Sequence, residues 1–135
     1  MSFVAPATTS VGHVHLRAAD LNSAITFYSE VLGFTLNLRY GTQAAFLGAG
    51  GYHHHIGLNT WDSLNALPPP KGHTGLYHAA FLYPDRASLA RVYRSVLDAG
   101  YALTGWADHG VSVALYLDDP DGNGVELYYD RPHAE

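Results

Sequence analysis

Histidine and glutamate are the residues of this sequence most able to do chemistry. The chain holds nine histidines in 135 residues, and most lie in or beside stretches that alternate like β-strands. His13 and His78 are 65 residues apart, and Glu126 stands in an otherwise apolar stretch near the C-terminal end. Two imidazoles and one carboxylate form a ligand set that suits Fe(II) or Mn(II). A lone strand histidine is more often a packed or surface residue, so the metal hypothesis requires a fold that brings the three together.

An internal repeat gives a reason to expect that convergence. The 65-residue offset of His13 and His78 pairs like residues further along the chain, which is typical of a duplicated unit. The matched pairs are Asp20 and Asp85, Ser23 and Ser88, Tyr28 and Tyr93, Val31 and Val96, and Leu32 and Leu97. If a pseudo-twofold axis relates the two copies, His13 and His78 occupy equivalent places and can face each other across it.

Each copy predicts one strand, one helix and three further strands. The first helix begins at Asp20 or Asn22 and ends at Gly33, and the second ends at Gly100. The strands are expected at 11–18, 34–40, 43–48 and 52–59, and then at 76–83, 101–105, 111–118 and 124–129.

The predicted fold class is α+β, with two tandem βαβββ modules that form an open, incompletely closed barrel around a metal cleft. The 135 residues are expected to form a single domain. Module one covers about 11–62, a Pro/Gly-rich linker about 63–75, and module two about 76–131.

Strand alternation assigns the polar side chains to one face. The apolar residues of each strand are expected to pack under the helix, which leaves the polar ones on the opposite face. The polar residues placed there are His13, His15, His53, His55, Asn59, His78 and Glu126.

Composition limits the partners. The net charge is −5 and no basic cluster occurs, which argues against nucleic acid. No stretch reaches the roughly 20 apolar residues of a membrane span, and the first residues do not resemble a signal peptide, so we expect a cytoplasmic protein. Only 14% of residues are charged, while ten are tyrosine, which predicts a further surface buried in a homodimer.

Four short motifs stand in the first copy: Gly12-His-Val-His-Leu16, Asp20-Leu21, Phe27-Tyr28 and Val31-Leu-Gly-Phe34. Together they resemble the opening module of the vicinal oxygen chelate superfamily, which includes glyoxalase I, bleomycin-binding proteins and extradiol dioxygenases. The resemblance spans about 11–132. This resemblance implies that the metal ligands are His13, His78 and Glu126.

The second copy resembles the extradiol dioxygenase signature, with one departure at Ala107. The matching residues are His109, Leu115-Tyr116, Asp119-Pro120, Gly122 and Glu126. The stretch Tyr52–Trp61 is similar to catechol 2,3-dioxygenase-type members. The resemblance therefore implies a metal-dependent, ring-cleaving dioxygenase of aromatic catabolism that takes a small catechol-type diol and O2. The metal would be Fe(II), or else Mn(II) or another divalent ion.

The same resemblance implies roles for individual residues. Tyr116 would hydrogen-bond a substrate oxygen, and His109 would help to hold the oxygen or the substrate. The acid–base histidine would be His55 by its predicted facing, with His53 second. His15 and Asn59 are expected to bind substrate beside Tyr116.

Two other functions remain open: a glyoxalase-like metal enzyme and a non-catalytic small-ligand-binding protein of the same superfamily. Glyoxalase I needs a carboxylate in copy one opposite Glu126, where this chain has only histidines. A phosphonate-directed thiol transferase is disfavoured because 101–129 has no Lys or Arg. The metal site is expected either within one chain or between exchanged modules of a dimer.

Overall fold

The computed structural model describes residues 2–132, and both predicted modules are present in it. Module one consists of β1 (Val14–Arg17), α1 (Leu21–Thr26), the π-helical segment η1 (Phe27–Val31), β2 (Thr35–Tyr40), β3 (Ala44–Gly48) and β4 (Ile56–Asn59). Module two consists of β5 (Ala79–Leu82), α2 (Arg86–Asp98), β6 (Gly105–Asp108), β7 (Ser112–Asp118) and β8 (Gly124–Asp130).

The two sheets have the same topology. Their strand orders are β1-β4-β3-β2 and β5-β8-β7-β6, and in each the first strand runs parallel to the last. All other neighbours are antiparallel. The predicted α+β class and the two tandem βαβββ modules are therefore confirmed. Within the described chain the two sheets stay separate and open.

The helix boundaries follow the predicted signals. The Asp20 side chain accepts a hydrogen bond from the backbone N–H of Asn22, and Asp85 caps α2 by accepting one from the N–H of Ser88. Gly33 and Gly100 adopt φ values of 89° and 86° just beyond the helices, where residues with a side chain are strained. The repeat therefore predicted the caps of both helices.

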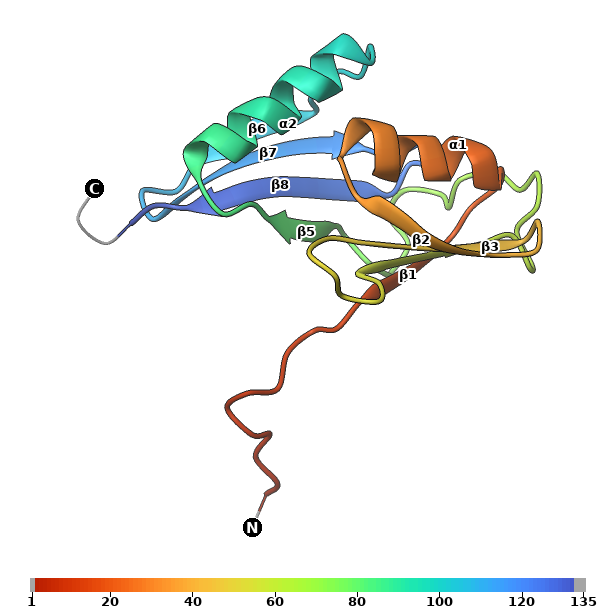
Figure 1. Cartoon of the computed structure of the whole chain (residues 1–135), viewed down its shortest axis with the longest axis horizontal. Coiled ribbons are helices and arrows are strands. Elements are labelled where there is room, and N and C mark those ends of the chain that lie inside the picture. The colour runs from red at the N-terminus through yellow and green to blue at the C-terminus, as the bar shows by residue number, and fades with distance from the viewer. Residues whose placement is uncertain (1, 133–135) are drawn as a thin grey trace.

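The hydrophobic core lies between the helices and the sheets. Both helices lie on the same side of the two sheets (Figure 1). The largest fully buried side chains of this core include Tyr28, Phe27, Leu47, Ile56, Val96 and Leu127. The opposite side of the sheets has no helix, and no residue of β2 is buried. Each sheet therefore keeps one open face.

Four predicted strands differ clearly from the structure in their bounds. The stretch 52–59 is a strand only from Ile56, and 101–105 becomes β6 at 105–108. The first difference has a local cause: the Asn37 side-chain amide donates to the carbonyls of Tyr52 and His53, which holds these residues as a loop crossing over β3. The strands expected at 11–18 and 76–83 are also shorter, at 14–17 and 79–82.

Candidate active site

Four predicted site residues gather on the open face of sheet two. Tyr116 of β7 stands directly opposite Glu126 of β8 in the antiparallel register. The His78 ring lies just before β5, with its centroid 5.9 Å from that of Tyr116. His109 Nε2 is 3.5 Å from the Tyr116 hydroxyl. The parallel pairing of β5 with β8 places Ala80 opposite Glu126, so His78 lies beside Gly124, two positions before Glu126 on the neighbouring strand.

Gly124 makes this close approach possible. A Cβ at this position would lie 2.4 Å from the carbonyl oxygen of Tyr77 and 3.1 Å from the His78 Cβ. A larger residue would push the segment that carries His78 away from β8.

The Tyr116 hydroxyl is held in its protonated form. A hydrogen bond to Glu126 and, to a smaller degree, burial raise the pKa of Tyr116 above its ordinary value. The hydroxyl is therefore a hydrogen-bond donor at neutral pH, which suits the predicted contact with a substrate oxygen.

The histidines of module one form a second group on sheet one. His13 lies just before β1, and its ring centroid is 4.4 Å from that of His54. The His54 ring meets Phe46 edge to face at 5.0 Å, and its Nδ1 is 2.7 Å from the Nδ1 of His53. Slight burial and the neighbouring histidines lower the pKa of His54, which favours a neutral imidazole beside His13.

The prediction of His55, then His53, as acid–base histidine used strand alternation, and this premise was wrong for the loop before Ile56. His55 Nδ1 accepts a hydrogen bond from the N–H of Ala49, and its ring packs near Tyr52 at 4.8 Å. His53 stacks on Tyr52 at 4.1 Å. The sequence interpretation left out His54, which is the one of the three whose ring contacts His13.

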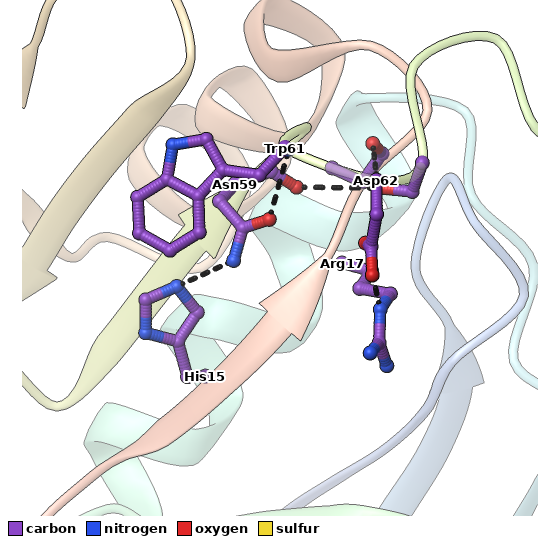
Figure 2. Close-up of polar contacts among 7 residues, drawn as sticks. His15, Arg17, Asn59, Trp61 and Asp62 are labelled. Atoms are coloured by element: carbon purple, nitrogen blue, oxygen red, sulfur yellow. Dashed lines mark hydrogen bonds and ion pairs between the residues drawn. The ribbon is translucent and has the colours of Figure 1, made fainter.

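Two of the three residues predicted to bind substrate, His15 and Asn59, are hydrogen-bonded to each other (Figure 2). Asn59 Oδ1 accepts from the backbone N–H of Trp61, so the amide nitrogen of Asn59 must face His15 Nε2, at 2.9 Å. Burial, and then the charge of His13, lower the pKa of His15. A neutral His15 that accepts at Nε2 carries its proton on Nδ1.

Gly57 provides the space for the His15 ring. The two residues are neighbours in the β1–β4 register, and a Cβ on Gly57 would lie 2.6 Å from His15 Nδ1. The imidazole therefore lies over the backbone of β4, where any other residue at position 57 would displace it.

Within one chain, the two groups of residues do not meet. Across residues 2–132, no three His, Asp or Glu side chains lie close enough together to hold a metal ion. His78 and Glu126 share sheet two, whereas His13 belongs to sheet one. Of the two arrangements expected from the sequence, the structure does not contain the one with all three ligands in one chain. The exchanged arrangement remains a prediction.

No helix among the described residues is both long and apolar enough to pass through a lipid bilayer.

Comparison with known proteins points to one family. The model of the Glyoxalase/Bleomycin resistance protein/Dioxygenase superfamily matches residues 10–127. A catechol-2,3-dioxygenase of Bacillus subtilis is 44% identical over 99 residues, which cover 73% of this chain and 35% of the relative. A biphenyl-2,3-diol 1,2-dioxygenase of Rhodococcus globerulus is 32% identical over 133 residues, with 92% of this chain and 65% of the relative covered. The chain thus spans only part of these relatives.

A solved structure supports the fold independently. A glyoxalase/dioxygenase from Nostoc punctiforme superposes with a TM-score of 0.78 at 21% identity, covering 98% of this chain and 99% of that one. At this identity the likeness concerns the fold alone.

Proposed function

Because the chain belongs to the glyoxalase/bleomycin resistance protein/dioxygenase superfamily, we propose that it is a metal-dependent extradiol dioxygenase. It would open the ring of a catechol-type diol with O2. The observation that carries the proposal is the grouping of His78, His109, Tyr116 and Glu126 on one open sheet face. Two relatives named as dioxygenases of aromatic diols support it.

The donor set fits a divalent metal only if two copies of the chain contribute. We place the ligands as His78 and Glu126 of one copy and His13 of a second, in a homodimer whose open faces meet. Two imidazoles and one carboxylate suit Fe(II) and leave positions free for substrate. When bound, a ferrous ion would hold the diol oxygens and provide an electron path between the diol and O2.

Three side chains near the proposed ligands suit roles in this reaction. We place the acid–base role on His54, since its ring contacts His13 and its lowered pKa keeps it ready to accept a proton from a diol hydroxyl. Tyr116, which stays protonated, would donate a hydrogen bond to a substrate oxygen. His109 would hold the Tyr116 hydroxyl in place.

An assay of ring opening tests the function. Protein loaded anaerobically with Fe(II) is mixed with catechol in air, and oxygen uptake is followed together with the yellow ring-opened product. Uptake of one O2 per product supports the proposal. Catechol binding without oxygen uptake would instead indicate a ligand-binding protein, and activity only on thiol adducts of 2-oxoaldehydes a glyoxalase-like enzyme.

The first prediction concerns the carboxylate ligand. Glu126→Gln should lower the iron content of the purified protein strongly, since a neutral amide is a poor ligand for a hard divalent ion. Elemental analysis measures the metal per chain. Glu30→Gln is the matched control, because Glu30 is exposed in η1 on the helix side. Normal iron content in the Glu126 variant would remove this residue from the site.

A further inference from the structure

Trp61 is a large apolar side chain left exposed beside the candidate site. It lies two residues after the end of β4, and 57% of its surface is accessible. Its indole lies 5.8 Å from the His15 imidazole, centroid to centroid, with the two planes tilted by 37°. Exposed tryptophan is often a contact residue, because a rigid ring of this size gains much from being covered.

The position of Trp61 is fixed by polar contacts. Its backbone N–H donates to Asn59 Oδ1 at 3.1 Å, and Asn59 itself is only 8% exposed. The amide nitrogen of Asn59 donates a hydrogen bond to His15, whose ring lies over Gly57. Figure 2 shows the Asn59 amide beside the Trp61 ring, joined to His15 by a hydrogen bond. The indole therefore belongs to a preorganised group rather than to a free loop.

A continuous row of rings connects Trp61 to the predicted metal ligand. Successive centroids are 4.4 Å apart from His13 to His54, 5.0 Å from His54 to Phe46, 5.9 Å from Phe46 to His15, and 5.8 Å from His15 to Trp61. His13 and His15 are two strand positions apart, or about 6.6 Å. A diol held at His13 would therefore extend its ring over Phe46 and His15, and only a substituent on that ring would reach Trp61.

Charge at the far end of this row is already balanced. Arg17 follows His15 on the same face, and its Nε donates to the Asp62 carboxylate at 2.8 Å. Both side chains are exposed, so the pair is weak, yet it removes the local excess of positive charge that would attract a carboxylate substituent.

We propose that Trp61 determines substrate specificity, and that the site takes catechols with a flat apolar substituent in preference to catechol itself or a carboxylated diol. The inference rests on the proposed function, because it assigns the same open face to the bound diol. Trp61 acts by contact with the substituent, and the reacting atoms lie at the other end of the row.

Steady-state kinetics on paired substrates tests the proposal. The quantity is the ratio of kcat/KM for 4-phenylcatechol to that for catechol, measured with iron-loaded protein. Trp61→Ala should lower this ratio about tenfold, which is the scale of one lost aromatic contact, and Trp61→Phe should keep most of it. The control is Trp106→Ala. Trp106 pairs with Leu115, which pairs in turn with the fully buried Leu127, so Trp106 lies on the face of sheet two opposite to Glu126.

A second readout needs no turnover. The chain has two tryptophans, so Trp106→Phe leaves Trp61 as the sole indole. Under anaerobic conditions, 4-phenylcatechol should change its fluorescence at about tenfold lower concentration than catechol.

The outcomes separate this inference from the proposed function. A Trp61→Ala ratio equal to that of the unaltered protein would overturn the specificity role. So would a Trp61→Ala protein that sediments as a monomer while the unaltered protein is a dimer, since Trp61 would then be an interface residue. If the unaltered, iron-loaded protein opens neither diol, the proposed function fails, and the fluorescence titration still decides whether Trp61 contacts the substituent.

Discussion

Three consecutive histidines, His53 to His55, occupy three different environments. His54 contacts His13 and Phe46, His53 lies on Tyr52, and His55 accepts the N–H of Ala49. Three identical side chains at neighbouring positions therefore contact three different sets of residues.

The second prediction separates these histidines. His54→Ala should lower kcat on catechol by about 100-fold or more, because a positioned acid–base group contributes on this scale, and the variant should keep its iron. His55→Ala is the matched control, with kcat within a few-fold of the unaltered protein. Stopped-flow absorbance of the ring-opened product measures both. Loss of turnover in His55→Ala alone would return the acid–base role to the residue expected from the sequence.

The sequence was informative for module two and less so for this loop. Strand alternation holds through β7 and β8, so Tyr116 and Glu126 share a face as expected. It does not hold at 53–55, where Asn37 pins two carbonyls and the backbone leaves the strand. A side chain-to-backbone contact between two separate segments leaves no periodic signal, so the contact of His54 with His13 could not be predicted.

At the scale of elements, several hydrogen bonds join the two modules, and the one between Tyr28 and Asp119 is buried. The Tyr28 hydroxyl in η1 donates to Asp119 Oδ2 at 2.7 Å, and both residues are buried. Asp119 also accepts from the backbone N–H groups of Asp121 and Asn123, so the carboxylate is well supplied with donors. The bond connects the helix of module one to the β7–β8 turn of module two.

The third prediction measures this connection. Tyr28→Phe should lower the free energy of unfolding by about 1.5–3 kcal/mol, the usual contribution of a hydrogen bond to a charged group. Urea denaturation followed by circular dichroism gives the value. Tyr93→Phe is the control: Tyr93 is the repeat counterpart of Tyr28 but is 38% exposed, so its loss should cost less than about 0.5 kcal/mol. Equal effects would contradict a specific contribution from the Asp119 contact.

Tyr28 and Tyr93 also show what the repeat can and cannot predict about the fold. The 65-residue offset paired Tyr28 with Tyr93 and both helix caps with each other, because each module repeats its own local signals. It could not predict that Tyr28 is fully buried at the junction while Tyr93 is not. The partner of the Tyr28 hydroxyl is Asp119, which lies in the other module and has no counterpart among the matched pairs of the repeat.

At the scale of the whole molecule, the open faces explain the unusual composition. Only 14% of the residues are charged, and large apolar side chains remain exposed on the helix-free side. Leu38, Tyr40 and Leu82 are 57%, 69% and 56% exposed and stand in register with open-face residues of their neighbouring strands. A second copy that covered these faces would bury these side chains, which agrees with the proposed homodimer.

The fourth prediction tests whether the proposed metal site is shared between two chains. His13→Ala and Glu126→Gln should each be inactive alone, because every dimer then lacks one ligand in both sites. A heterodimer of the two variants has one site with both defects and one intact site. Random exchange makes about half of the dimers mixed, so about a quarter of the sites, and of the activity, should return. Two affinity tags allow the mixed dimer to be purified and assayed for ring opening. With all three ligands in one chain, every site of every mixed dimer would carry a defect, and mixing would restore nothing.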